Sequence, residues 1–342
     1  MEKLSSRLSH LMQPGCNFLG VSYAIMGGAM SWVSERNLVA AISNAGGFGV
    51  IACGAMTPDL LRQEICGTQA LTTKPFGVNL ITMHPQLDAL IDVCIAENVG
   101  HVVLAGGVPG APAIKKIKDT GRKLICFTPA LTLGKRLVKM GVDALVIEGM
   151  EAGGHIGPVS TSVLAQEILP EIRTVPVFVA GGIGRGEAIL SYLEMGAAGV
   201  QLGTRFVCAV ESIAHPRFKQ AFIRANARDA LPSVQMDARF PVIPVRALVN
   251  AGTRRFMDKQ REVIARFDAG ELTKEAAQLE IEHFWAGALR RAVIDGDVEN
   301  GSVMAGQSVG LVKQEQPARE IIAELLAQAE STLAARAASA QP

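Results

Sequence analysis

One histidine in this 342-residue chain stands out because of the residues around it. His155 follows two glycines within the stretch Glu148–Gly157, which comes directly after the apolar run 144–147. Glycine lets the backbone lie close to a flat ring. Imidazole, with an unperturbed pKa of about 6.5, suits proton transfer at neutral pH. A lone histidine is more often structural, so spacing alone leaves a catalytic and a structural role open.

Two glycine turns could bind a phosphate group. Gly181 and Gly182 follow the seventh of eight apolar runs, and Gly203 and Thr204 follow the eighth. Backbone N–H groups at such turns bind phosphate without a cationic side chain. Barrel enzymes often hold a phosphate at these two strand ends. Either turn alone could serve only to reverse the chain, but together they predict a ligand that carries a phosphate.

Two further strand ends offer ligand contacts. Gly27, Gly28 and Met30 come after the first run, where small residues and a thioether suit contact with an apolar ring. Asn79 ends the third run with an amide that can donate and accept hydrogen bonds, although asparagine is also a common turn former. No HExxH, GxSxG or Walker A motif is present, and the cysteines are scattered. The sequence therefore predicts no metal site and no serine hydrolase.

The elements that must position these residues are short apolar runs separated by helix-like segments. Such runs are typical of parallel strands buried on both faces, and their spacing leaves room for helical crossovers. Eight units predict a closed (β/α)8 TIM barrel rather than an open doubly wound sheet. Thr57 before Pro58 and Ser160 before Thr161 are N-cap signals, and Ser34 is expected to open the first crossover helix. The predicted strands are Tyr23–Met26, Gly49–Ala52, Phe76–Leu80, His101–Leu104, Lys123–Phe127, Ala144–Ile147, Val175–Ala180 and Gly199–Leu202.

The strand–helix rhythm breaks after Thr204. Residues 1–210 are predicted to form the main part of the barrel. Residues 211–290 are richer in charge and predict a small, mostly helical lobe inserted after strand eight. Residues 291–342 are expected to return to the barrel, with a C-terminal helix over 317–335 that keeps its apolar residues near one face.

Bulk composition narrows the class of protein. Hydrophobic residues make up 49% of the chain and charged residues 19%, and the net charge is +1. Because no block of like charge occurs, neither nucleic acid nor an anionic membrane surface is an expected partner. No stretch reaches the roughly 18 uninterrupted apolar residues of a membrane span, and no signal-peptide core is evident. We therefore expect a soluble cytoplasmic protein whose six cysteines are small buried hydrophobes.

Taken together, these motifs resemble the nitronate monooxygenase (2-nitropropane dioxygenase) superfamily of FMN-dependent barrels. Within it, the closest likeness is to the flavin-dependent enoyl-acyl-carrier-protein reductases. The resemblance runs from Gly27 to about Val312 and is most specific at Glu148–Gly157, Gln201–Phe206 and Gly296–Gln307. The last of these stretches has no physical meaning that can be derived from its residues alone.

The resemblance implies which residues contact FMN and which one acts in catalysis. His155 falls on the family's catalytic histidine. One well-described group of nitronate monooxygenases has Gln where this chain has Glu148, and Ala where it has Arg205; both departures favour the enoyl reductase branch. The implied FMN contacts are Gly27, Gly28, Met30, Asn79, Glu148, Gly153, Gly182, Gln201, Gly203 and Thr204, with Gly181 in the same turn as Gly182.

The implied activity is that of an FMN-dependent NAD(P)H oxidoreductase, with an enoyl thioester as the favoured electron acceptor. Oxidation of nitronates with O2, or reduction of a quinone, would use the same pocket and stays open, as does the choice of NADH or NADPH. A flavin-binding protein without turnover would have no use for His155. The expected substrate is a small molecule or an acyl thioester that an acyl carrier protein could carry, and the expected assembly is a homodimer.

Overall fold

Eight parallel strands form a closed barrel in the computed structural model, which describes residues 4–54, 56–285 and 287–339. The strands are paired in the order β1-β9-β8-β6-β5-β4-β3-β2, and a parallel bridge between Met26 and Phe48 joins β1 to β2. The (β/α)8 prediction is confirmed. The strands are β1 (Ile25–Gly27), β2 (Gly49–Ala52), β3 (Phe76–Ile81), β4 (His101–Ala105), β5 (Lys123–Phe127), β6 (Ala144–Glu148), β8 (Val177–Ala180) and β9 (Gly199–Leu202).

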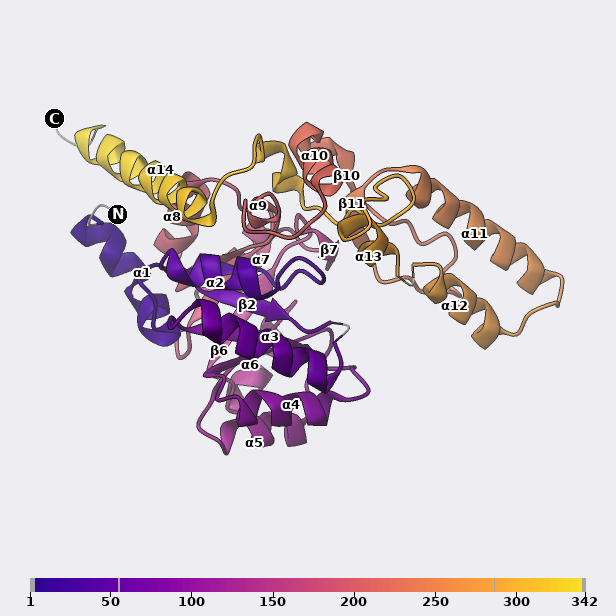
Figure 1. The fold of residues 1–342 in the computed structure, drawn as a ribbon, viewed down its shortest axis with the longest axis horizontal. Coiled ribbons are helices and arrows are strands. Elements are labelled where there is room, and N and C mark those ends of the chain that lie inside the picture. The colour runs from indigo at the N-terminus through magenta and orange to yellow at the C-terminus, as the bar shows by residue number, and fades with distance from the viewer. Residues whose placement is uncertain (1–3, 55, 286, 340–342) are drawn as a thin grey trace.

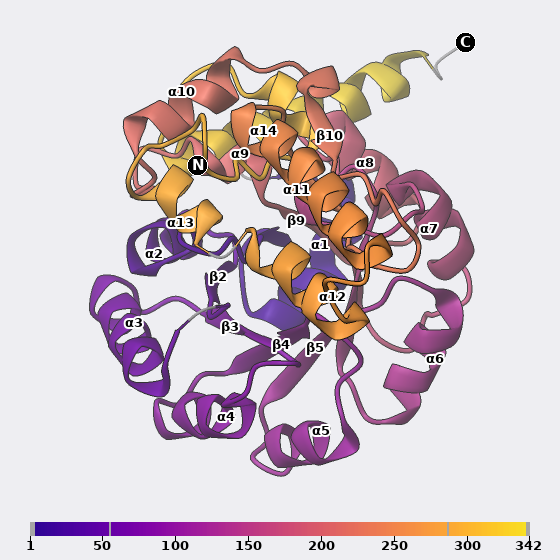
Figure 2. The same ribbon diagram turned by 90° about the vertical axis from the view of Figure 1, so that its right-hand side faces the viewer.

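A ring of helices surrounds the strands (Figure 2). Thr57 caps α3 as predicted, because its side chain accepts a hydrogen bond from the N–H of Leu60. The prediction that Ser34 opens α2 was wrong: the helix begins at Arg36, and the Ser34 hydroxyl instead donates to the carbonyl of Gly28 over 2.7 Å. The crossover helices are α2 (Arg36–Asn44), α3 (Pro58–Leu71), α4 (Leu87–Ala96), α5 (Ala111–Lys118), α6 (Leu131–Lys139), α7 (Thr161–Ile168) and α8 (Gly186–Glu194), and the short α9 (Thr204–Val207) follows β9.

Helix α1 (Ser6–Leu19) closes the amino-terminal end of the barrel, behind the strands in Figure 2. The ring of Phe18 lies 5.6 Å from the ring of His101 and 6.2 Å from that of Phe178. His101 Nε2 lies 3.1 Å from the carbonyl oxygen of Phe18, and Lys123 donates to the same carbonyl. Helix α1 was not predicted from the sequence.

Residues after α9 form an arm and then return to the barrel. Helices α11 and α12 extend to one side (Figure 1) and share a small core of Phe240, Phe256, Val263, Ala277 and Ile281. The lobe boundaries at 210 and 290 stay a prediction. The C-terminal helix is 22 residues long, yet no helix in the described ranges is both long and apolar enough to cross a bilayer. The elements are α10 (Pro216–Arg224), β10 (Ala230–Pro232), β11 (Val245–Leu248), α11 (Ala251–Asp268), α12 (Lys274–His283), α13 (Ala288–Val293), the 3-10 helix η2 (Gln307–Leu311) and α14 (Ala318–Ser339).

The cysteines follow the prediction only in part. Cys53, Cys94, Cys126 and Cys208 are buried, as expected of small apolar residues. Cys66 is exposed on α3, so the expectation of a buried side chain was wrong there.

His101 should make the protein sensitive to acid. Burial lowers the pKa of His101 from 6.5 to about 4; nearby Lys123 also opposes protonation, whereas Asp143 favours it. The unfolded chain would therefore bind a proton that the folded chain excludes, and stability should fall as the pH drops from 6.5 toward 4. The loss would be at most about 3 kcal/mol. Urea unfolding on both sides of this window should show a smaller loss for His101→Gln than for the wild type; equal losses would place the acid sensitivity elsewhere.

Candidate active site

The strand register places two polar side chains inside the barrel mouth. Glu148 on β6, Ala180 on β8 and Gln201 on β9 are direct neighbours in the ladder, so their side chains share one face of the sheet. Phe178, two residues before Ala180, meets Phe18 at the closed end of the barrel, so this face is the interior. Glu148 and Gln201 therefore point into the mouth on either side of a small alanine.

Asn79 is a third polar side chain on the interior face. It lies two residues after Gly77, which pairs with His101 at the closed end. Its side chain is 5% exposed and its Oδ1 has no hydrogen-bond partner among the described residues, while Gln201 is 7% exposed. Within the same ranges, the side chains of Gln201 and Glu148 also make no hydrogen bond. Buried polar groups are almost always paired, so the unpartnered Oδ1 of Asn79 indicates a polar ligand.

Burial dominates the electrostatics of Glu148. Glu148 as a whole is half-buried, but its carboxyl group is surrounded by protein atoms. Loss of hydration raises its pKa from 4.5 to about 8, and no charged side chain contributes to the shift. Glu148 is the one carboxylic acid among the residues predicted to contact the ligand, so its pKa determines the charge on this side of the mouth.

The loop after β1 lies against the turn after β9. The N–H of Gly28 donates to the carbonyl of Leu202 over 2.8 Å, and a Cβ atom at Gly28 would come within 3.1 Å of the Cα of Gly203. The Met30 sulfur would lie 3.4 Å from a Cβ atom at Gly203. The structure thus brings Gly28, Met30 and Gly203 together, whereas Gly27 packs behind them against Ile42 of α2.

The stretch 296–307 acquires a physical meaning in the structure. A Cβ atom at Gly153 would fall 2.6 Å from the carbonyl carbon of Ala305, so only glycine fits beside this segment. The N–H of Gly306 donates to the Thr204 hydroxyl over 3.0 Å, and the N–H of Gln307 donates to the carbonyl of Glu151 over 2.9 Å. The segment therefore joins the loop before His155 to the turn after β9.

His155 lies on a short strand, β7 (Gly154–His155), and not in the loop that the sequence predicted. It pairs antiparallel with Val245 of β11, which also pairs with β10. Buried Arg246 fixes this sheet by donating to the carbonyls of Met150 and Ala230 over 2.9 and 2.5 Å. The imidazole itself is exposed, although surrounding protein atoms displace part of its hydration and lower its pKa. It is accessible to a substrate.

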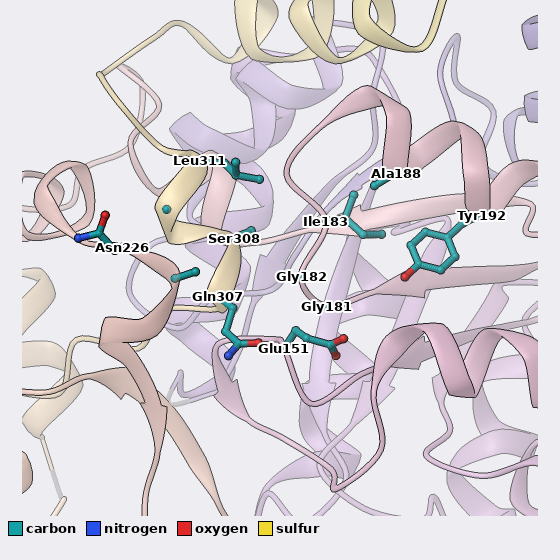
Figure 3. Close-up of a pocket in the computed structure, with 12 residues that line it drawn as sticks. Glu151, Gly181, Gly182, Ile183, Ala188, Tyr192, Asn226, Gln307, Ser308 and Leu311 are labelled. Atoms are coloured by element: carbon teal, nitrogen blue, oxygen red, sulfur yellow. The ribbon is translucent and has the colours of Figure 1, made fainter. Parts of the chain in front are cut away.

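The first phosphate turn lines a pocket of about 500 Å³ (Figure 3). Gly181 and Gly182 adopt positive φ angles of 98° and 70°, which favour glycine. Gln307 and Ser308 of η2 form another wall. The second turn, with Gly203 and Thr204, does not line this pocket. It lies next to the pocket, because the Thr204 hydroxyl accepts from the N–H of Gly306, which directly precedes Gln307 of the pocket wall.

Most residues that line the pocket were not predicted from the sequence as site residues, among them Tyr192, Asn226 and Ser308. The stretch 296–307 includes only Gln307 of the pocket wall, and its position could not be derived without its long-range contacts.

Comparisons with known proteins agree with this geometry. A model of the nitronate monooxygenase family matches residues 13–90 and 86–328. The structure of FabK from Thermotoga maritima is 35% identical with a TM-score of 0.85, covering 98% of this chain and 100% of that one.

Two curated relatives span nearly the same length. The (3aS,4S,5R,7aS)-5-hydroxy-7a-methyl-1-oxo-octahydro-1H-indene-4-carboxyl-CoA dehydrogenase of Rhodococcus jostii is 30% identical over 332 residues, which cover 91% of this chain and 94% of the relative. The nitronate monooxygenase of Paraburkholderia phytofirmans is 28% identical, with 90% and 92% covered. The chain belongs to the nitronate monooxygenase family and is an oxidoreductase.

Proposed function

We propose that the protein is an FMN-dependent NAD(P)H oxidoreductase that reduces an enoyl thioester. The observation that carries this proposal is the set of polar side chains on the interior face at the mouth, Asn79, Glu148 and Gln201, of which the buried Asn79 Oδ1 has no hydrogen-bond partner among the described residues. Bound FMN would carry two electrons from the nicotinamide to the substrate, which is chemistry that amino-acid side chains do not supply.

The residues of the mouth fit a flat ring with polar edges. Glu148 and Gln201 are separated by the strand that carries Ala180, so their backbones lie about 10 Å apart, two strand spacings. A tricyclic ring could rest on the alanine and find a hydrogen-bonding group at each side. Asn79 would supply a further polar contact.

The glycine turns fit the phosphate end of FMN. Gly182, Gly203 and Thr204 can offer backbone N–H groups to a phosphate, and neither glycine has a side chain to obstruct it. Nothing in the sequence resembles the longer dinucleotide-binding fingerprint, which supports FMN over FAD.

An exposed imidazole at the edge of the mouth supports a reaction that needs a proton. His155 would supply or organise the proton that the α-carbon of the thioester takes up. The Rhodococcus relative is named as a dehydrogenase of a CoA thioester, which supports a thioester substrate. An acyl carrier protein or coenzyme A would carry the acyl group, and the homodimer stays a prediction.

Nitronate oxidation is the second candidate. The family model and the Paraburkholderia relative both have this name, and a nitronate would use the same mouth. Quinone reduction is a further alternative, which no separate observation supports.

The cofactor can be tested with a matched pair of variants at Gly203. The wild type should purify yellow and release FMN on denaturation. Gly203→Asp should lose the flavin because a carboxylate repels the phosphate. Gly203→Ala should retain it, since a Cβ atom there would contact only the Met30 side chain, at 3.4 Å. The measurement is flavin absorbance per protein after gel filtration; full flavin content in the Asp variant, or release of FAD, would contradict the assignment.

The reaction can be tested by anaerobic mixing. NADH or NADPH should bleach the flavin absorbance, and crotonyl thioester should restore it while one nicotinamide is consumed per thioester reduced. Rapid oxidation of a nitronate by O2 without nicotinamide, together with no reduction of any enoyl thioester, would reverse the ranking of the two candidates.

His155→Ala should separate binding from chemistry. The side chain is exposed, so its loss should cost little stability, and FMN should stay bound. Bleaching by NAD(P)H should persist, whereas the step with thioester should slow by about 10²–10⁴-fold, the usual contribution of a positioned acid or base. Stopped-flow absorbance measures both steps. An unchanged thioester step would make His155 structural, and loss of FMN would move it to the cofactor contacts.

A further inference from the structure

Glu148 is the one ionisable residue in the interior layer at the barrel mouth. Alternation along the paired strands assigns each strand one inward-facing residue near its carboxyl end, and we call these eight residues the interior layer. The nearest titratable residues along the chain lie outside the layer. Glu151 accepts from the N–H and hydroxyl of Thr161, Asp143 is in an ion pair with Lys118, and His155 is exposed. The layer consists of Met26, Ala52, Asn79, Ala105, Phe127, Glu148, Ala180 and Gln201.

This environment disfavours an ionised carboxylate. No cation faces Glu148 in the layer, and none of its described neighbours donates a hydrogen bond to it. An unpaired carboxylate in such surroundings takes up a proton rather than bear the cost of burial, and the pKa of about 8 has burial as its cause. The neighbouring amides of Asn79 and Gln201 can both donate and accept, so they do not require a charged partner.

We propose that Glu148 is a neutral carboxylic acid at pH 7 and that its O–H donates a hydrogen bond to an acceptor atom on the edge of the bound flavin. This inference rests on the proposed function. A neutral Glu148 can donate a hydrogen bond, as a glutamine side chain of the same length can. Unlike glutamine, it loses this donor when it ionises at alkaline pH. An ionised Glu148 would present only acceptor atoms to the ring and would oppose negative charge placed on the ring by reduction.

The first measurement uses the protein without flavin. The infrared spectrum near neutral pH should contain a carboxylic-acid C=O band that disappears in Glu148→Gln. Glu187→Gln is the matched control: Glu187 lies on α8 in an ion pair with Arg185, and its pKa is lowered, so this variant should lose a carboxylate band instead. An unchanged acid band in Glu148→Gln would overturn the neutral state.

The second measurement is the dissociation constant of FMN as a function of pH. Wild-type affinity should weaken by roughly tenfold as the pH rises through about 8, the change expected for one pKa unit of coupling. Glu148→Gln should bind like the wild type at neutral pH and show no such weakening, whereas Glu148→Ala should bind weakly throughout.

The midpoint potential gives a third readout. In the wild type it should fall with pH about twice as steeply as in Glu148→Gln at the pH where Glu148 ionises in the oxidised FMN complex, about one unit above its pKa in the free protein, because one more proton would accompany the two electrons. Identical pH profiles for wild type and Glu148→Gln would overturn the hydrogen bond to flavin. A protein that binds no FMN at any pH would instead contradict the proposed function, while the infrared result would still decide the protonation state.

Discussion

The parallel hydrogen bonding of β6, β8 and β9 is the constraint on which the candidate site depends. Glu148, Ala180 and Gln201 face the same way only because they are direct neighbours in this ladder. A shift of one residue would turn a polar side chain outward into the layer beneath the helices. Residues nearer the closed end of the barrel help to fix this register, because the rings of Phe178 and His101 pack against the ring of Phe18. Packing at the closed end of the barrel thus determines which way Glu148 and Gln201 point at the mouth.

Segments distant in sequence complete the mouth. Gly306 reaches Thr204 from 102 residues away, and Arg246 reaches Met150 from 96 residues away. These contacts explain why a segment after the arm belongs to the site: it bonds to the turn after β9 and packs against Gly153, where no side chain would fit. The candidate active site is therefore complete only when segments from nearly the whole length of the chain are in place.

This organisation explains what the sequence could predict. Parallel strands buried on both faces leave apolar runs that can be predicted locally, so all eight strands were predicted, and Asn79 could be placed at the end of one of them. Gln201 was named as a ligand contact only through the family resemblance, and both contacts stay predictions. The β7–β11 pairing was missed because Gly154–His155 is only two residues long and its partner lies in the arm. The prediction at Ser34 was wrong because a serine just before a helix can also bond to a preceding loop. Here its hydroxyl donates to the carbonyl of Gly28.

The two titratable groups of the mouth are shifted in opposite directions by the same cause. Loss of hydration raises the pKa of Glu148 and lowers that of His155, so at neutral pH both side chains favour their uncharged forms. An anionic nitronate would gain little from such surroundings, because no cation faces it from the interior layer. A thioester and a flat, largely apolar ring have no charge to be compensated there. The electrostatics of the mouth thus favour the thioester, and they do so through the same burial that leaves its polar groups free to bind a ligand.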